Sequence, residues 1–487
     1  MTPFATLLLT PLLASALLAG VGHRPIGAWI NVLVSFVTLA ASLLLSWQVR
    51  EEGSLLAFGG VFFLDSFNIF LVALTSFVAT TTSLFSRPYM AHECVRRGLA
   101  RRHMRFYHAM YQLFIFAMLL ALSTNNLGIL WIALELATLA TVLLVSLYRT
   151  PQAIAAGWKY FILCGVGIAM ALFGTVLIFF TSSRILGHGN PALTWTLLHE
   201  NATELDPQVM VLAFLFLVVG YGTKVGLAPM HTWLPPAHGE GPTPISAVLS
   251  GLLLNVALYA LVRCKMLVDV ATGSDVAGTI LMGFGLFSVM VATFSLYRQK
   301  DVKRLYSYSS VEHMGLITFS FGVGTPLANF AGLLHMTVHS LVKSGIFFTV
   351  GHAAQAMGTQ RIGGIRGLIT HQPGIGWGLL LGTVAISGLP PFGVFASEFM
   401  MFTATLQTHP WLVAPLLFFL LVGIGGLFLK VQPMVYGPPP AEAVAVTVSM
   451  LPVYVHLGLA LVLGVAIPPV LAQWYDHAAR LLSGGMQ

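Results

Sequence analysis

The chain has 487 residues, of which 57% are hydrophobic and only 8% are charged, with a formal net charge of +7. A soluble domain carries about 25% charged residues because its surface faces water. A deficit of this size over the whole length excludes an ordinary soluble protein and predicts a polytopic membrane protein.

Apolar runs of about 20 residues, long enough to cross the roughly 30 Å hydrocarbon layer, recur along the sequence. Backbone polar groups must be satisfied within each segment in lipid, so these runs are predicted to be helices. The alternating segments of a transmembrane barrel do not stand out. We expect an all-α protein with about fourteen spans, at 4–22, 27–48, 58–85, 106–124, 126–148, 153–182, 208–236, 244–266, 276–297, 306–322, 327–352, 376–404, 411–435 and 450–472.

The first span could be mistaken for a secretory signal peptide. No Lys or Arg precedes its apolar run, and Arg24 follows it, which is the reverse of a secretory signal. We interpret it as a membrane helix.

The basic residues predict the orientation. The loop 86–105 is rich in arginine, and further basic residues lie around Lys300 and Arg361. With fourteen spans these three loops fall on one side, whereas the acidic loop 183–207 falls on the other. The positive-inside rule makes the basic side cytoplasmic and places both termini outside. A solvated cytoplasmic loop explains the arginine run better than nucleic-acid binding does.

The sequence offers no sign of a cofactor site. Cys94, Cys164 and Cys264 lie far apart without CxxC spacing, which argues against an iron–sulfur cluster, a zinc site or a disulfide framework. GxGxxG and GxxxxGK[ST] motifs are absent, so neither a dinucleotide nor ATP is expected to drive this chain directly.

Five ionisable residues lie within or at the edge of the apolar spans: Glu135, Lys159, Lys224, Lys343 and Glu398. An ionised group at mid-bilayer costs at least about 2.5–3.5 kcal/mol, so it normally faces the bundle interior and serves a pathway. The alternative is a salt bridge that only pairs helices. Glu135 lies midway through its helix, and an approaching lysine would change its affinity for a proton. Lys224 and Lys159 are the candidate partners.

Two spans are interrupted. Lys224 lies in YGTKVGLAPMHTWLPP, which Gly226 and several prolines break, and Glu398 follows a similar break at Gly388 in ISGLPPFGVFASEFMMF. Broken helices at corresponding places in two halves predict an inverted repeat with sites beside the unwound backbone, although simple proline kinks are an alternative. The expected divisions are three N-terminal helices with the basic loop, two five-helix repeats, and a C-terminal loop and helix, at 1–105, 106–266, 276–435 and 436–487.

The eleventh span reads LLHMTVHSLVKSGIFFTVGHA. His335, His339 and Lys343 are spaced i, i+4, i+8, so they share one helix face. Histidine is a common member of proton relays. Glu312 and His313, at the start of the tenth span, could extend this row. Alternatives are histidines that only pack, or a metal site at His335 and His339, for which no acidic or cysteine third ligand lies nearby in sequence.

Several long motifs carry a resemblance that runs from roughly Arg105 to Gly437. They are the helix of Glu135, KVGLAPMHTWLPPAHGEGPTPISA, DVKRLYSYSSVEHMG, HMTVHSLVKSGIFF and GLPPFGVFASEF. With them the chain resembles the antiporter-like membrane subunits of respiratory complex I, group 4 hydrogenases and multisubunit cation/proton antiporters, and is most similar to the hydrogenase-4 component F branch. The resemblance implies fourteen helices with two inverted five-helix repeats.

The resemblance also implies roles for individual residues. Glu135 and Lys224 match the family's carboxylate–lysine pair, Lys343 a relay lysine, and Glu398 the terminal residue of the broken twelfth helix. One position departs from the pattern, because Asn255 stands where complex I relatives usually carry a lysine. Asparagine cannot titrate and can only hold a water wire or bond to a neighbour. The eleventh-span residues would then have to bridge the gap.

These inferences predict a proton-translocating subunit of a hydrogenase-4 or formate hydrogenlyase-like complex in the bacterial cytoplasmic (inner) membrane. It would have other membrane and peripheral subunits as partners, Ni-Fe and iron–sulfur centres in those subunits, and no metal or cofactor of its own. The alternatives are a cation/proton antiporter subunit or a module for ion or inorganic-carbon uptake. The expected proton pathway comprises Glu135, Lys159, Lys224, His231, Asn255, Glu312, His335, His339, Lys343 and Glu398.

Overall fold

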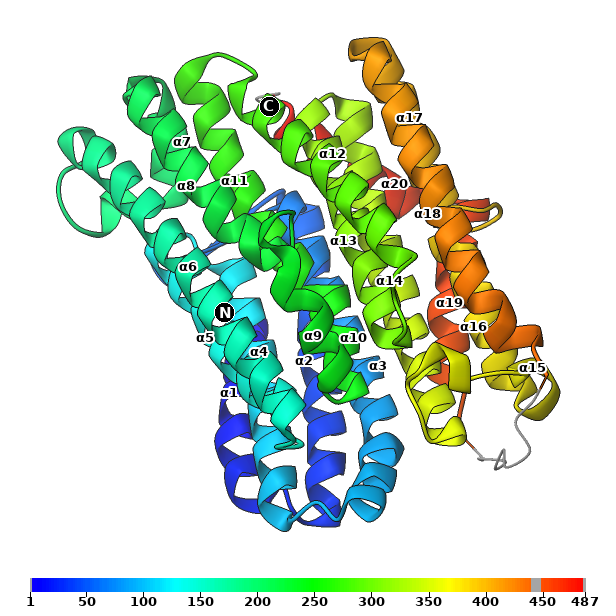
Figure 1. Ribbon diagram of the computed structural model, residues 1–487. Helices are drawn as coiled ribbons and strands as arrows, with labels where there is room; N and C mark the ends of the chain where they lie inside the picture. Colours follow the sequence, from blue (N-terminus) through cyan, green and yellow to red (C-terminus); the bar gives the residue numbers. More distant parts are fainter. Residues whose placement is uncertain (1, 439–447, 485–487) are drawn as a thin grey trace.

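The computed structural model describes residues 2–438 and 448–484 and shows a bundle of long helices (Figure 1). In the first half, the elements are α1 Thr2–Val21, α2 Pro25–Glu52, β1 Leu55–Ala57, β2 Phe62–Leu64, α3 Ser66–Arg97, α4 Arg101–Ser123, α5 Leu127–Val145, α6 Pro151–Leu186, η1 Asn190–Leu193, α7 Trp195–Glu200, η2 Ala202–Glu204, α8 Pro207–Val225, η3 Met230–Trp233, α9 Leu234–Glu240, α10 Thr243–Val248, the π-helical η4 Leu249–Leu253 and α11 Leu254–Thr272. In the second half they are α12 Val276–Leu296, α13 Val302–Val323, α14 Pro326–Met357, η5 Ile362–Gly364, α15 Leu368–His371, α16 Pro373–Ile386, α17 Gly393–Thr408, α18 Pro410–Tyr436, α19 Leu451–Val465 and α20 Pro469–Leu482. Part of the expected C-terminal loop, 439–447, lies outside the described residues.

The predicted all-α membrane fold is confirmed. Among the described residues, eleven helices are long and apolar enough to cross a membrane, and a twelfth span results when α19 and α20, bent by 75°, are counted together. Each of the fourteen predicted segments contains helix, but two fall short of this standard. The segment 306–322 forms α13, which is less apolar because it carries several serines, Glu312 and His313. These side chains are buried among other helices and do not face lipid. The segment 376–404 is divided between the shorter α16 and α17.

The third helix begins at Ser66, eight residues later than predicted. Residues 55–64 instead form an antiparallel hairpin, with Gly59 and Gly60 at positive φ in its turn. Asp65 then starts the helix, because its carboxylate accepts hydrogen bonds from two backbone N–H groups of α3, both at 3.0 Å. The prediction was wrong here because a short apolar run does not distinguish strand from helix.

Both predicted helix breaks are present. After α8, Gly226 takes up a left-handed conformation with φ of +83°, and the chain passes through η3 before α9 begins. After α16, Gly388 has φ of +61°, and α17 begins at Gly393. Glycine tolerates this backbone region because it has no Cβ.

Glycines allow close approach between the helices that surround the interior. A Cβ added at Gly220 of α8 would lie 2.5 Å from the backbone nitrogen of Ala171 in α6. Membrane helices use small residues in this way to bring their backbones together. The most apolar windows of α14 and of the α10–α11 span are completely buried inside the bundle. Side chains on α14 are therefore surrounded by protein.

The three basic loops gather at one end of the molecule. Arg96 Nη2 donates to Gly358 O at 3.0 Å, which joins the end of α3 to the end of α14. The backbones of Asp301 and Arg361 form an isolated antiparallel β-bridge, which joins the other two basic loops. In Figure 1, α15 and the α3–α4 connection lie at the lower end, whereas α7, in the acidic loop, lies at the upper end.

We expect the basic end to face the cytoplasm, and cysteine labelling of intact cells tests this. In a Cys94→Ser background, a membrane-impermeant thiol reagent should modify Thr203→Cys and spare Ala100→Cys, since both positions are exposed at opposite ends. Permeabilised cells provide the control, in which both should react. Labelling of Ala100→Cys alone in intact cells would reverse the orientation.

Candidate functional site

Glu135 and Lys224 form an ion pair between α5 and α8, with 3.4 Å between Lys224 Nζ and Glu135 Oε2. Lys224 lies in the last turn of α8, just before the break, and is completely buried. Its Nζ also donates to the Thr138 hydroxyl, which in turn donates to the Leu134 carbonyl at 2.9 Å. The break in α8 and one face of α5 thus hold the ammonium group between a carboxylate and a hydroxyl.

The other candidate partner of Glu135 does not take this position. Lys159 lies on an exposed face of α6, and in the described part of the chain no carboxylate pairs with it. Its neighbour Tyr160 points inward and is buried. His231, in η3, is 6% exposed, and its ring lies 5.9 Å from that of Tyr308. The structure therefore selects Lys224 as the partner of Glu135.

A second group of ionisable side chains lies on α13, α14 and α17. His335, His339 and Lys343 share one face of α14, and each is completely buried. Lys343 Nζ donates to the backbone carbonyl of Tyr306 in α13 at 2.9 Å. The helical spacing therefore does place these three groups in the protein interior, as the sequence predicts.

Glu312 of α13 is also buried, at 2% exposure. Its carboxylate accepts a hydrogen bond from Thr293 Oγ1 at 3.3 Å and lies against Gly423 of α18, where any Cβ would overlap it. The charges of Glu312 and Lys343 act on each other. An ionised Glu312 would favour an ammonium group at Lys343.

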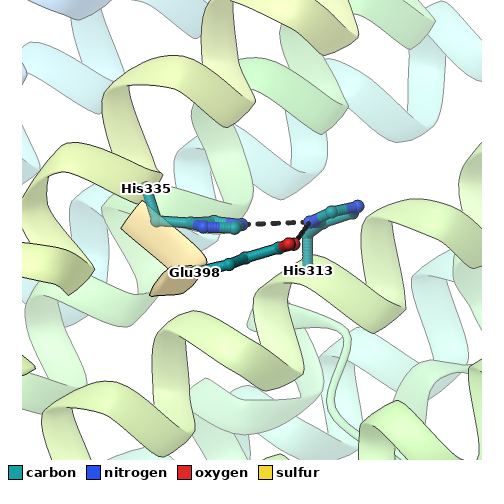
Figure 2. Close-up of side chains that lie close together, drawn as sticks. All are labelled: His313, His335 and Glu398. Carbon is teal, nitrogen blue, oxygen red and sulfur yellow. Dashed lines mark hydrogen bonds and ion pairs between the residues drawn. The ribbon is translucent and has the colours of Figure 1, made fainter. Parts of the chain in front are cut away.

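Three helices bring His313, His335 and Glu398 together (Figure 2). His313 Nδ1 lies 3.0 Å from His335 Nε2 and 4.0 Å from Glu398 Oε1. The ring of His339 lies 5.8 Å from that of His313. Among the described residues, Glu398 Oε1 has no hydrogen-bond partner. The result is a buried pair of imidazoles beside a carboxylate oxygen that is available for a proton or a water molecule.

Ser397 is the hydrogen-bond partner of His335 Nδ1. The Ser397 hydroxyl lies 2.8 Å from Val394 O and 3.1 Å from Gly393 O, to which it donates, and 2.9 Å from His335 Nδ1. A hydroxyl has one hydrogen to donate, so when Ser397 donates to a backbone carbonyl it accepts from His335 Nδ1–H. His335 Nε2 is then the acceptor that faces His313, and His313 Nδ1 supplies the hydrogen between the two rings.

The ligand atoms of His313, His335 and Glu398 all lie within 4.8 Å of one another, a separation that could hold a metal ion. The sequence argument against a metal relied on the lack of a third ligand near His335 and His339, and the fold supplies such groups from two other helices. A metal ion would have to displace the hydrogen shared by the two imidazoles. The arrangement in the structure is that of a hydrogen-bonded pair suited to passing a proton.

Asn255 joins α11 to α14, directly after the π-helical turn η4. Its Nδ2 donates to Ser340 Oγ at 2.7 Å and to Met336 O at 3.2 Å, whereas Oδ1 has no partner within the described ranges. A second contact in this region joins Ser250 and Ser310 at 2.7 Å. The region between the Glu135–Lys224 pair and the α14 group thus contains neutral hydrogen-bonding side chains.

With this geometry established, the comparison with known families becomes informative. The family described as "NADH:quinone oxidoreductase/Mrp antiporter, TM" matches residues 124–425, which is more than half of the chain. The chain belongs to this family. The match covers all ten side chains of the expected proton pathway, so they lie within the part that defines this antiporter-like subunit.

Relatives of this antiporter-like subunit extend the match to the full length. A hydrogenase-4 component F homolog from Methylacidiphilum infernorum is 46% identical over 98% of this chain and 99% of its own length. The fold is similar to that of a chain in the archaeal membrane-bound sulfane sulfur reductase, with a TM-score of 0.88 at 23% identity, covering 99% and 97% of the two chains. A chain of the Mrp complex from a Dietzia species is also similar in fold, with a TM-score of 0.85 at 19% identity, covering 99% of this chain and 98% of that chain. These neighbours are subunits of multisubunit membrane complexes.

Sequence reasoning missed several polar side chains of this antiporter-like subunit. Thr138 and Ser397 were overlooked because hydroxyl residues are common in membrane helices, and only the fold places them on Lys224 and His335. His238 and Lys303 lie in the motifs LPPAHGEG and DVKRLY, whose histidine and lysine were an available signal. Both are buried.

Replacement of Gly388 tests how the break positions Glu398. In Gly388→Ala, the added methyl group would overlap the Glu398 carboxylate, and a non-glycine residue at this positive φ costs about 1–2 kcal/mol. We expect a lower thermal unfolding temperature of the assembled complex. Gly283→Ala is the control, because that position on α12 faces open space. Equal unfolding temperatures for Gly388→Ala and the wild type would contradict the placement of Glu398.

Proposed function

We propose that this chain is a proton-translocating membrane subunit of a hydrogenase-4 or formate hydrogenlyase-like complex in the bacterial cytoplasmic membrane, with both termini outside. The observation that supports this most is the series of ionisable groups inside the bundle, which begins at the partly buried Glu135 and the buried Lys224 and continues through Lys343 and His335 to Glu398. Buried ionisable residues in membrane helices commonly mark ion pathways. The 46% identity to a hydrogenase-4 component F homolog supports the hydrogenase assignment.

The proposed pathway has two ionisable segments and a neutral connection. The first segment is the Glu135–Lys224 pair, with His231 near the break. Asn255 and Ser340 form the connection, because their amide and hydroxyl can order water between the segments. The second segment contains Glu312 and the α14 residues and ends at Glu398. Lys159 is not included, because its side chain lies on an exposed surface.

Energy for transport would come from partner subunits. Moving a proton against 100 mV requires about 2.3 kcal/mol, and the sequence contains no nucleotide-binding motif to supply it. We infer that Ni-Fe and iron–sulfur centres in partner subunits perform the redox chemistry. Coupling between such a centre and the Glu135–Lys224 pair would be reciprocal, since each changes the binding free energy at the other.

We also propose that 106–266 and 276–435 are the two inverted repeats, flanked by 1–105 and 436–487. The two helix breaks support this division, because each of the two repeats contains one broken span with an ionisable residue near the break. In transporters with inverted repeats, binding sites lie next to such unwound backbone.

A second candidate function is cation/proton antiport or partner-driven ion uptake. The structural likeness to a chain of the Mrp complex favours it. Ion flux measured in vesicles without any electron donor separates the candidates. A hydrogenase-type subunit should transport protons only when the redox partners turn over, whereas an antiporter should exchange ions along an imposed gradient.

The ion pair provides the first functional test. Glu135→Gln keeps the size and hydrogen bonding of the side chain but cannot ionise, so we expect proton transport in reconstituted vesicles to fall to background while the complex still assembles. Lys224→Arg should fail as well, because arginine stays charged and cannot release its proton. Glu200→Gln is the control, because Glu200 is an exposed acid in the loop 183–207 and lies outside the proposed pathway. Normal transport by Glu135→Gln would make this pair structural only.

The neutral connection provides the second test. We expect Asn255→Ala to reduce transport modestly, since it removes hydrogen bonds worth about 1 kcal/mol each and water can fill the space. Lys343→Met, or His335→Gln combined with His339→Gln, should stop transport because these variants remove ionisable stations. Copurification of the partner subunits controls for assembly. If Asn255→Ala abolishes proton transport but Lys343→Met keeps it, the proton route runs along α11 instead.

A further inference from the structure

A cavity of about 390 Å³ opens at the basic end of the molecule, between the ends of α3 and α14 and the loops that precede α6 and α13. Its lining is strongly polar and includes three carboxylates, from Glu93, Glu240 and Asp301, together with basic side chains such as Arg97. A cavity of this size and polarity holds water. The proposed function leaves it without a role.

Glu93 lies at the inner wall of this cavity and is 2% exposed. Its carboxylate accepts hydrogen bonds from Arg97 at 2.7 Å and from Tyr148 and Gln355 at 3.1 Å each. Burial raises the pKa of the Asp301 carboxyl above its ordinary value, which helps it to hold a proton. The cavity thus contains a carboxyl that favours a proton, that of Asp301, together with the ion pair of Glu93 and Arg97, at the cytoplasmic end of the bundle.

Lys303 lies behind the cavity in the first turn of α13 and is 1% exposed. Its Nζ donates to Gly241 O at 2.6 Å, His238 O at 3.3 Å and Gly239 O at 3.4 Å. These carbonyls lie at the end of α9, and Lys303 has no carboxylate partner in the described part of the chain. Lys303 therefore connects the cavity wall to the helix turn that carries His238.

His238 lies between Lys303 and the α14 group. It is completely buried, and neither ring nitrogen has a hydrogen-bond partner among the described residues. Its ring stacks on Phe347, one helical turn beyond Lys343, with 5.0 Å between ring centroids. The charges of Lys303 and Lys343 both act on this imidazole. Buried nitrogens are normally bonded, so water is the partner that the site requires.

We propose that this cavity is the cytoplasmic proton inlet, and that His238 passes protons from its water to Lys343. One ring nitrogen of His238 accepts a proton from cavity water, and the other releases a proton to the neutral amine of Lys343 by way of water. The imidazole returns to its neutral form and Lys343 becomes the ammonium ion. This inference rests on the proposed function, since it adds an entry point to the same pathway.

Blocking the cavity tests the inlet in inside-out vesicles of the whole complex. In a Cys94→Ser background, Gln152→Cys places a thiol at the cavity edge, and a bulky, charged methanethiosulfonate should lower donor-driven proton transport at least about tenfold, the fold-change that corresponds to 1.4 kcal/mol. Reduction of the mixed disulfide should restore the rate, which an unfolded subunit would not show. Ala100→Cys, on the same surface but outside the cavity, should react without loss of transport.

Substitution of the histidine tests the inner step. His238→Gln keeps a polar side chain of similar length but cannot bind a proton, so transport should stop while the partner subunits still copurify. His108→Gln, another buried histidine outside the pathway, should keep transport. If the unmodified complex transports protons but either blocked Gln152→Cys or His238→Gln transports normally, the inlet is wrong. If the unmodified complex transports no protons, the proposed function itself fails.

Discussion

A charged group inside a membrane protein must be compensated by neighbouring charges, hydrogen bonds or water, because lipid offers none of these. The interior of this chain is organised around that requirement. Lys224 is compensated by the Glu135 carboxylate and a hydroxyl, whereas Lys343 donates to a backbone carbonyl. Two imidazoles compensate each other through a shared hydrogen. Such groups need protein on every side, which accounts for the burial of the α14 segment that carries His335, His339 and Lys343.

The helix breaks make this compensation possible. A continuous helix uses its backbone groups internally, so a side chain beside it meets few polar partners. At Gly226 and Gly388 the chain leaves the helix, which frees backbone carbonyls and allows neighbouring elements to approach. The carbonyls at the end of α9 serve Lys303 in the same way. The interrupted helices thus supply polar backbone partners inside the bundle.

Features that depend on local pattern could be predicted from the sequence. The helix breaks follow from glycine and proline, and the shared face of His335 and Lys343 follows from helical spacing. Features that depend on packing could not. Lys159 and Tyr160 are adjacent in an apolar helix, and composition does not reveal which faces the interior. The meeting of His313, His335 and Glu398 joins three helices, so residues far apart in sequence became neighbours without a local signal.

On the proposed pathway, Asn255 stands where the resemblance to complex I relatives implies a lysine, and this difference would determine how the two halves communicate. The amide and the serine hydroxyls between the clusters can relay a proton but cannot store one, because neither group titrates near neutral pH. On the proposed pathway, a proton would therefore be held at the Glu135–Lys224 pair or at the α14 group. On that pathway, a charge gained at one group would act on the other, because charges interact more strongly in a medium of low dielectric constant than in water. In this proposal the two groups inside the bundle hold the proton, and the neutral side chains between them only conduct it.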